Sequence, residues 1–335
     1  MTQTLLITGG AGFIGANLVH HLLAVEPEAT LVILDKLTYA GNLAYLDGAL
    51  ELERVAFEQV DIADFEAVAG VFARHQPSGV YHLAAESHVD RSITGPAAFV
   101  QTNVVGTFNL LECARQTWIE GDKTGRFLHV STDEVYGSLG AEGAFTEHTA
   151  YDPSSPYSAT KASSDHLVNA YGRTYGMDVV ITNCSNNFGP YQYPEKLIPV
   201  VIRNIRDERP LPIYGDGQNV RDWLFVEDHC RALHAVFARG ESGRCYNVGT
   251  ENEWTNLALV ERLCDLCDAR LGREAGASRK LITFVTDRPG HDRRYAIDPS
   301  RIHDELGWSP THTFDEAIAL TVDWYLEHLG SMWGL

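Results

Sequence analysis

The sequence predicts an α/β fold, a doubly wound parallel sheet with a smaller carboxyl-terminal lobe. Short apolar runs alternate with amphipathic stretches through the first half of the chain, and such alternation is typical of βαβ units whose helices cover both faces of a parallel sheet. A glycine-rich turn follows the first of these runs. The chain has 335 residues, more than the roughly 250 to 300 over which one core usually extends, so a large domain and a smaller lobe are expected.

Each predicted element follows from its length and its apolar spacing. Runs of a few consecutive apolar residues predict buried strands, and longer stretches with apolar residues three and four apart predict helices. The predicted strands are residues 5–8, 30–35, 55–60, 80–84, 127–132 and 179–183, and the predicted helices are residues 13–24, 65–74, 97–118 and 157–175.

From about residue 186 the chain changes character. Loops rich in Pro, Tyr and Gly appear there, with short strands and scattered helices, although no long polar linker marks a boundary. We assign residues 1–185 to the sheet domain and residues 186–335 mainly to the second lobe. A return of the chain to the sheet domain is expected around residues 222–249.

The charge of the chain excludes several classes of partner. Its formal value is 26 − 45 = −19, which repels nucleic acid and anionic membrane surfaces at long range. The first residues lack a cationic stretch, and no apolar run approaches the roughly 18 residues that cross a bilayer. We predict a cytoplasmic protein with no nucleic-acid and no membrane partner, in which any anionic ligand meets a local cationic patch.

Six cysteines in a chain of this length are too few for a disulfide framework. Cys264 and Cys267 have the C-x-x-C spacing of a metal or redox site, but apolar residues recur around them at helical spacing and no second pair follows. Core packing is the favoured interpretation. Two pairs of nearby histidines show no spacing that closes a site with the cysteines, so no metal is predicted.

The turn after the first predicted strand has the spacing of a dinucleotide-binding fingerprint. Thr8-Gly-Gly-Ala-Gly-Phe-Ile-Gly15 opens a predicted helix and carries Gly9, Gly12 and Gly15. The first glycine permits the tight turn, the second lets the backbone approach a pyrophosphate, and the third lets helix and strand pack closely. A plain glycine-rich turn is the alternative, but the strand before it and the helix after it favour a Rossmann-type domain.

Two aspartates at predicted strand ends suit the rest of a dinucleotide. Asp35 lies 20 residues after Gly15, where a carboxylate can accept both hydroxyls of a ribose and would repel a 2′-phosphate. This favours NAD over NADP, while the adjacent Lys36 keeps NADP open. Asp61 can reach an adenine amino group or, alternatively, face solvent.

Tyr157 and Lys161 lie four residues apart, so a helix puts the phenol and the ammonium on one face. A nearby cation favours the phenolate, which predicts that Tyr157 takes a proton from an alcohol near neutral pH while Lys161 reaches the nicotinamide ribose. Alone, such a pair occurs often by chance and is more often a solvated helix face. The fingerprint upstream and Ser131-Thr132 at a predicted strand end favour catalysis.

Further segments resemble a known family. They are His82-Leu-Ala-Ala-Glu-Ser-His-Val-Asp-Arg-Ser92, Ser131-Thr-Asp-Glu-Val-Tyr-Gly137, Ser185-Asn-Asn-Phe-Gly-Pro-Tyr-Gln-Tyr-Pro-Glu-Lys-Leu-Ile-Pro199, Pro212-Ile-Tyr-Gly215, Arg221-Asp-Trp223 and Asp287-Arg-Pro-Gly-His-Asp-Arg-Arg294. With Tyr157 and Lys161 they resemble the extended short-chain dehydrogenase/reductases that act on nucleotide sugars, and among these the dTDP-glucose 4,6-dehydratases. The resemblance extends from about residue 3 to residue 328.

The adjacent acids Asp133 and Glu134 resemble those of the dTDP-glucose dehydratases. They distinguish this family from the epimerases and decarboxylases of the same group. Elimination of water needs one group that removes a proton and another that gives one, and two carboxyls with separated pKa values can do both. Two acids on a solvated loop are the alternative. Their position at the carboxyl end of a predicted sheet strand, where open α/β sheets bind ligands, favours the catalytic interpretation.

The resemblance implies a reaction with no net redox change. Tyr157, supported by Lys161 and Thr132, takes the proton of the sugar 4-hydroxyl while hydride passes from C4 to NAD. Glu134 then removes the C5 proton and Asp133 protonates the departing C6 hydroxyl. Hydride returns to C6, giving dTDP-4-dehydro-6-deoxy-glucose for rhamnose-type deoxysugars, and NAD stays bound through the cycle.

The resemblance also implies two sets of binding residues. For the dinucleotide these are Gly9, Gly12, Phe13, Ile14, Gly15, Asp35, Lys36, Leu37, Thr38, Asp61, Ile62, Leu83, Ala84, Ala85, Ser87, Thr102, Tyr157, Lys161 and Asn187. For the nucleotide sugar they are Ser87, Thr132, Asn186, Lys196, Leu197, Pro212, Ile213, Tyr214, Arg221, Asn256, Asp287, Arg288, Pro289, Gly290 and His291.

A basic stretch accompanies the second set. Between residues 278 and 301 there are six Lys or Arg, at positions 279, 280, 288, 293, 294 and 301, against acids at 287, 292 and 298. This local excess of positive charge suits a substrate diphosphate through charge-assisted hydrogen bonds. A solvated basic stretch is the alternative.

The segment 137–153 departs from the family pattern, because many relatives carry a longer insertion there. Loop length is tolerated energetically, so this affects the expected shape of a lid more than the chemistry. Kinship further implies a homodimer in which the helices at 97–118 and 157–175 form a four-helix interface.

Two other functions stay open at this point. One is a nucleotide-sugar 4-epimerase or a dehydratase of another nucleotide sugar on the same scaffold. The other is a non-catalytic NAD-binding regulatory protein, against which the intact Tyr157, Lys161, Asp133 and Glu134 argue.

Overall fold

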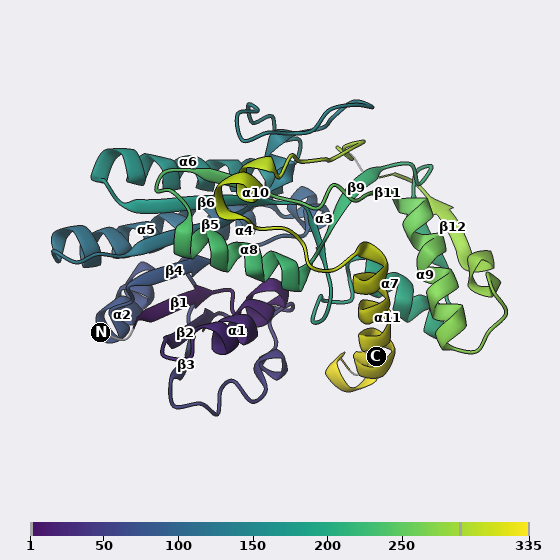
Figure 1. The fold of residues 1–335 in the computed structure, drawn as a ribbon, viewed down its shortest axis with the longest axis horizontal. Coiled ribbons are helices and arrows are strands. Elements are labelled where there is room, and N and C mark those ends of the chain that lie inside the picture. The colour runs from purple at the N-terminus through teal and green to yellow at the C-terminus, as the bar shows by residue number, and fades with distance from the viewer. Residues whose placement is uncertain (1–2, 288–289, 334–335) are drawn as a thin grey trace.

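The computed structural model describes residues 3–287 and 290–333. A large parallel sheet with helices on both faces lies beside a smaller lobe of short strands and helices (Figure 1). The predicted doubly wound α/β fold is confirmed.

Seven strands form the central sheet in the order β10-β6-β5-β4-β1-β2-β3. Every neighbouring pair runs parallel, so all the strands end at the same edge. The strands are β1 (Thr4–Thr8), β2 (Thr30–Asp35), β3 (Val55–Gln59), β4 (Gly79–His82), β5 (Arg126–Thr132), β6 (Asp178–Cys184) and β10 (Cys245–Val248).

Helices cover the two faces of the sheet and bury separate cores. α1 (Phe13–Val25) and α8 (Val226–Arg239) pack on one face, and α2 (Phe65–His75), α5 (Thr107–Arg115) and α6 (Pro156–Tyr175) pack on the other. Alternate residues of one strand supply the two cores: Leu5 and Ile7 face α1, whereas Leu6 faces α2. Strands buried on both faces need continuous apolar runs, which is why the sequence showed them so clearly.

The predicted helix at 97–118 is one continuous helical stretch with two π-helical parts. α4 (Pro96–Phe99) leads into the π-helix η2 (Val100–Gly106), and α5 leads into a second one, η3 (Gln116–Glu120). Such turns are rare and occur frequently at functional sites.

The second lobe contains two small sheets. β7 (Asn186–Phe188), β9 (Val220–Phe225) and β11 (Glu253–Thr255) form one, and β8 (Leu211–Tyr214) and β12 (Ile282–Val285) form the other. α7 (Leu197–Arg206), α9 (Asn256–Arg270) and α11 (Phe314–Trp333) pack around them. The shorter elements of the chain are η1 (Leu43–Leu46), α3 (Val89–Thr94), η4 (Asp133–Tyr136), η5 (Ala277–Leu281) and α10 (Ser300–Leu306).

The chain moves between the two parts more than once. α8 and β10 belong to the sheet domain, whereas residues 220–225 form β9 of the small sheet. α10 packs against α8 and β10, and α11 packs against α7 and α9. One apolar core continues from the α1 face of the sheet into the second lobe, so no solvent layer divides the parts.

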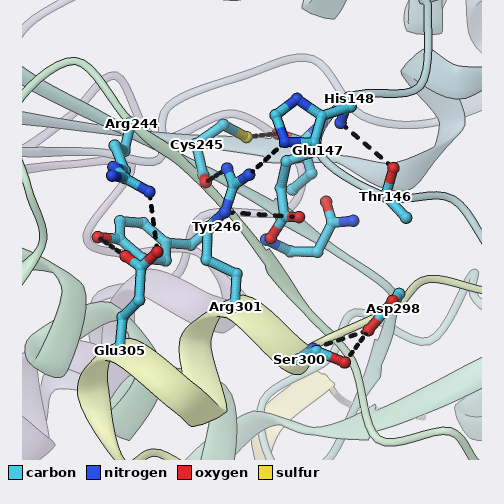
Figure 2. A network of polar contacts seen from close by, with 12 residues as sticks. Thr146, Glu147, His148, Arg244, Cys245, Tyr246, Asp298, Ser300, Arg301 and Glu305 are labelled. Carbon is cyan, nitrogen blue, oxygen red and sulfur yellow. Dashed lines mark hydrogen bonds and ion pairs between the residues drawn. The ribbon is translucent and has the colours of Figure 1, made fainter.

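The edge strand β10 is covered by the segment between β5 and α6. The Asn247 amide donates to Glu147 Oε1 at 3.0 Å, and the Asn247 side chain donates to the Phe145 carbonyl at 2.9 Å. Arg301 of α10 donates to the Cys245 carbonyl at 2.9 Å and lies 3.8 Å from Glu147 (Figure 2). The short segment 137–153 is therefore fixed to the sheet rather than loose.

Cys264 and Cys267 are fully buried in α9 within the apolar core, in agreement with core packing. Among the described residues no cluster of three or more His, Cys, Asp or Glu is arranged to hold a metal ion. None of the described helices combines the length and the apolar character that crossing a membrane requires.

Candidate active site

The carboxyl ends of the central strands surround a cavity of about 320 Å³. Its wall includes the glycine turn after β1, the end of β2, the segments after β4, β5 and β6, and the first turns of α6. This is where open α/β sheets bind ligands, because loops after neighbouring strands diverge there.

The glycine turn is packed so closely that side chains at Gly9 and Gly15 would clash with the backbone. Gly9 has φ +69°, and a Cβ at Gly15 would lie 2.1 Å from the Gly9 carbonyl oxygen. Gly12 precedes the first residue of α1, so the amino end of that helix opens on the cavity. Unpaired amides at a helix start attract phosphate, and the turn therefore fits the pyrophosphate of a dinucleotide.

Asp35 at the end of β2 is held by the backbone around it. Its two carboxylate oxygens accept the amides of Leu37 at 2.8 Å and Ala11 at 3.1 Å. Burial raises the pKa of Asp35 above its ordinary value, and these two amides oppose that rise. The carboxylate lines the cavity at the position expected for ribose recognition.

Lys36 is turned toward acids and does not form a free cationic site. Its Nζ lies 3.5 Å from Asp61 and 3.9 Å from Glu86, and it donates to the Thr102 hydroxyl at 3.3 Å. A 2′-phosphate beside Asp35 would thus meet two further carboxylates. The geometry therefore fits NAD. Lys36 was the reason to consider NADP, and its pairing with acids removes that reason.

Tyr157 and Lys161 begin α6 and both line the cavity. Ser155 caps the helix with a reciprocal pair of hydrogen bonds to Ser158, which sets where the helix starts. Lys161 Nζ donates to the Val130 carbonyl at 2.8 Å, which fixes the ammonium under the end of β5.

The surroundings of Tyr157 in the chain alone oppose a phenolate. Burial, followed by the negative charge of Glu134, raises the pKa of Tyr157 well above its usual range. Positive charge that enters the cavity would oppose this rise.

The two acids after β5 occupy different environments. Asp133 and Glu134 open the 3₁₀ turn η4, which Thr132 caps by accepting the Glu134 amide at 3.3 Å. Glu134 lines the cavity, whereas Asp133 is buried behind it and is 2% exposed. Burial, with the charges of Glu134 and Asp222, raises the pKa of Asp133 well above its ordinary value. The protonated form of Asp133 is therefore favoured, whereas the neighbouring Glu134 faces the ligand space.

The structure brings most of the predicted dinucleotide residues to the cavity. Leu37 and Asp61 do not line it, although Asp61 contacts Lys36. Of the predicted sugar-nucleotide residues, Ser87, Thr132, Asn186 and Lys196 line it. The described ones that do not are Leu197, Pro212, Ile213, Tyr214, Arg221, Asn256, Asp287, Gly290 and His291, and the prediction for Arg288 and Pro289 lies outside the described residues.

Several of these outlying residues lie near one another in the second lobe. Tyr214 ends β8, its ring centroid lies 6.3 Å from that of His291, and its hydroxyl is 3.5 Å from Asp90 of α3. A Cβ at Gly215 would approach Asp287 to 2.9 Å. Arg221 lies with its guanidinium 4.1 Å from the Tyr295 ring and donates to the Asp292 carbonyl. They form a second group, which approaches the sheet domain where Tyr214 meets Asp90.

In the described part of the basic stretch at 278–301 the arginines are not free. Its described arginines pair with acids from elsewhere in the chain: Arg279 with Asp265, Arg293 with Asp216, Arg294 with Glu253 and Arg301 with Glu147. The expectation of a locally cationic surface is wrong for these four, because their partners are far away in the sequence. Arg221 is a better candidate for holding a diphosphate.

Sequence reasoning missed part of the cavity wall. Cys184 and Ser185 at the end of β6 line it, as do Gln192, Tyr193 and Glu195 of the following segment. Four of these five fall within the motif 185–199, so the signal was present without an assigned role. The aromatic residues of that segment give no sequence signal of binding, because aromatic loop residues more often pack than bind.

A strand-end glycine turn, a ribose-facing carboxylate and a Tyr-x-x-x-Lys helix together define the class of protein, an extended short-chain dehydrogenase/reductase. A family model described as GDP-mannose 4,6 dehydratase matches residues 6–321. The dTDP-glucose 4,6-dehydratase of Shigella flexneri is 56% identical over 335 residues, which covers 96% of this chain and 92% of that protein. The chain belongs to the family of dTDP-glucose 4,6-dehydratases.

Solved structures agree with this family assignment and show that the backbone alone does not determine the activity. The dTDP-glucose 4,6-dehydratase of Streptomyces venezuelae with NAD and TYD bound has a TM-score of 0.90 and 46% identity, covering 98% of both chains. The UDP-glucose 4-epimerase of Thermus thermophilus in complex with NAD has a TM-score of 0.85 and 29% identity, covering 97% of this chain and 100% of the other. One backbone carries both activities, so the side chains must distinguish them.

Proposed function

We propose that this chain is a hydro-lyase that converts dTDP-glucose into dTDP-4-dehydro-6-deoxy-glucose, for deoxysugar biosynthesis, with NAD as a resident cofactor. The observation that carries the proposal is the acid pair of unequal environment, the buried Asp133 and the cavity-facing Glu134, directly beside Tyr157. An elimination needs these two roles and an epimerisation does not. Sequence identity of 56% to a dTDP-glucose 4,6-dehydratase supports the substrate.

The chain's own groups divide the proton transfers. When bound, NAD accepts and returns a hydride, and its positive ring favours the phenolate of Tyr157. Tyr157 takes the proton of the sugar 4-hydroxyl, with the Thr132 hydroxyl beside it. Glu134 removes the proton at C5, and Asp133 gives its proton to the departing C6 hydroxyl. Asp35 and the glycine turn hold the dinucleotide.

The second group of residues is the proposed site of the nucleotide sugar. Residues 1–185, with α8 and β10, would hold the dinucleotide, and residues 186–335 would mainly hold the sugar nucleotide. Arg221 supports this division, because it is a buried guanidinium whose charge acts on Asp133 and a guanidinium can bind a diphosphate in bidentate fashion.

The test is turnover without added cofactor. Purified protein is incubated with dTDP-glucose, and the product is followed by mass spectrometry for the loss of one water. We expect the lighter product with no accumulation of NADH, because the cofactor is regenerated in each cycle. No product even when NAD is supplied would contradict the proposal.

A 4-epimerase is the competing enzyme function, favoured only by the shared backbone. Its outcome in the same assay is conversion of UDP-glucose to an isomer of equal mass. A regulatory protein would bind NAD and convert neither sugar. The three functions therefore give three different mass spectra.

We further infer a homodimer formed through the helical stretch 97–118 and α6. Val100, Phe108 and Ile119 are between 42% and 45% exposed on that stretch, an apolar face that a second copy would cover. Sedimentation should give twice the chain mass, and Phe108→Glu should give the monomer. A wild-type monomer would contradict the inference.

We also propose a cytoplasmic location. The six cysteines are free, as is usual in a reducing compartment, and nucleotide-sugar chemistry takes place where NAD is available. Cell fractionation with a periplasmic marker as control tests it.

A further inference from the structure

A buried group of charged side chains lies behind Lys161, on the side away from the cavity. His129 of β5 and Asp165 of α6 are both fully buried, and His129 Nε2 lies 3.1 Å from Asp165 Oδ1. The same Nε2 lies 3.4 Å from Lys161 Nζ. The mechanism proposed above uses neither His129 nor Asp165.

The contacts of Asp165 favour its charged form. Asp165 Oδ2 accepts the hydroxyls of Ser131 at 2.8 Å and Tyr151 at 2.9 Å, and two such donors stabilise a carboxylate. Its other oxygen, Oδ1, lies 3.1 Å from His129 Nε2 but has no hydrogen-bond partner among the described residues. The His129 ring therefore lies between the Asp165 carboxylate and the Lys161 ammonium.

Asp165 thus supplies negative charge to a lysine that has no carboxylate within ion-pair distance among the described residues. Burying an ammonium without a counter-charge is costly, so the charge of Asp165, acting across His129, helps to decide whether Lys161 stays protonated. Burial lowers the pKa of Lys161 to about 8, and Asp165 opposes the fall. Burial raises the pKa of Asp165 to about 6, and Lys161 opposes that rise.

The surroundings of Asp165 contain few other charges. Lys161 and His166 approach it from α6, His129 and Ser131 from β5, Tyr136 and Tyr151 from the segment after β5, and Cys245 from β10. His82 of β4 lies beyond His129, with ring centroids 5.1 Å apart. Burial lowers the pKa of both histidines well below the usual range, so they stay neutral, and Lys161 and Asp165 are the charges that matter here.

Tyr151 links this group to the sheet edge. It lies on the segment that Glu147 and Arg301 fix to β10, and its hydroxyl also accepts from Asn183 at 3.3 Å. Figure 2 shows the contacts that fix Glu147 of this segment, four residues before Tyr151.

We propose that Asp165 is a positioning residue whose negative charge, acting across the His129 ring and with Tyr151 as its support, keeps Lys161 charged and directed at the cavity. The inference rests on the proposed function, in which Lys161 serves the dinucleotide and Tyr157.

The first test measures Lys161 directly in the cofactor-free protein. The chain has five lysines, at positions 36, 123, 161, 196 and 280, so ¹³C-labelled lysine gives few signals, and Lys161→Arg identifies the one of interest. Asp165→Asn keeps the shape and can still accept from Ser131 and Tyr151 while removing the charge. We expect the Lys161 titration to move down by about 1 to 3 pH units, and an unmoved titration would overturn the proposal.

The second test measures turnover across pH. In Asp165→Asn the alkaline fall of kcat should move to lower pH by the same interval, with the KM for dTDP-glucose within about twofold, because the charge acts on Lys161 and not on the sugar. A uniform loss of kcat at all pH values would indicate a merely structural role. The matched control is Asp323→Asn, which removes an exposed ion pair with Arg270 and should leave the profile unchanged.

A milder variant covers the case in which Asp165→Asn does not fold. Tyr151→Phe removes one donor to Asp165 and should move the Lys161 titration in the same direction by less, about half a pH unit. Tyr175→Phe, at the exposed end of α6, is its control. If wild-type protein does not convert dTDP-glucose, the proposed function fails, while the lysine titration in cofactor-free protein still decides the role of Asp165.

Discussion

The two sides of the proposed site are built in different ways. On the dinucleotide side, functional groups stand at the ends of neighbouring strands of one sheet, as Gly9, Asp35 and Glu134 do after β1, β2 and β5. On the sugar side, they come from short elements far apart in sequence, such as Tyr214 of β8 and His291 after β12. Parallel strands fix the first set by their register alone, whereas the second set depends on contacts between loops.

The largest expected effect removes the elimination chemistry and leaves the dinucleotide side intact. Glu134→Gln and Asp133→Asn should each lower kcat by about 10² to 10⁴, because a proton-transfer group is lost, with NAD affinity within about threefold. Turnover by water loss and NAD binding by calorimetry check this. Wild-type turnover in both variants would refute their assigned roles.

The next prediction concerns the rigidity of the strand ends on the dinucleotide side. Gly15→Ala would place a Cβ 2.1 Å from the Gly9 carbonyl, so helix α1 must shift, and we expect NAD binding to weaken at least about 100-fold. Gly140→Ala is the matched control, since nothing lies within 4 Å of its Cβ position. Equal NAD binding by wild type and Gly15→Ala would show that the strand ends do not fix the dinucleotide side rigidly.

A smaller effect is expected on the sugar side. Arg221→Lys keeps the charge but loses the planar fork, so the KM for dTDP-glucose should rise about 10- to 100-fold with kcat changed little. Arg279→Lys, whose guanidinium is already paired with Asp265, should change KM less than about twofold. If both variants raise the KM equally, the basic stretch attracts the substrate through its overall charge, and the ion pair of Arg279 with Asp265 does not matter for binding.

The smallest effect concerns stability at the junction of the two sides. His229 of α8 donates from Nδ1 to Asn187 Oδ1 at 2.8 Å, and burial lowers its pKa to about 3. A depressed pKa means that its contribution is complete above about pH 6.5 and is lost as pH falls toward 3. Between pH 6.5 and 5 the wild type should lose about 2 kcal/mol of unfolding free energy that His229→Gln does not lose.

Urea unfolding at several pH values measures this difference. His303→Gln, an exposed site, is the control and should follow the wild type. If the unfolding free energies of wild type and His229→Gln changed in parallel with pH, the predicted contribution of the buried, neutral His229 would be refuted.

The sequence predicted the dinucleotide side because its signals are local. A glycine spacing, a strand-end Asp35 and a four-residue interval between Tyr157 and Lys161 each need only a few neighbouring positions. The sugar side was identified through family resemblance, and its charge was misjudged because Arg294 is neutralised by Glu253, 41 residues away. The upward shift of the Tyr157 pKa had no sequence signal for the same kind of reason, since burial is a property of the folded whole.

Other features had no sequence signal at all. The π-helical turns around Thr102 follow a normal helical pattern of apolar residues. His129 and Asp165 are 36 positions apart (165 − 129), and nothing around either marks the pair. Only the packing of α6 on β5 brings them together.

The route of the chain has a practical consequence for engineering. After β6 the chain leaves the sheet domain, returns as α8 and β10, leaves again for β11, α9 and β12, comes back as α10 and ends as α11. No single cut detaches the smaller lobe, and a fragment ending at residue 185 would lack β10 and bare the β6 edge to aggregation. Grafting a new sugar preference from a relative therefore requires a mosaic of exchanged segments rather than the transplant of one block.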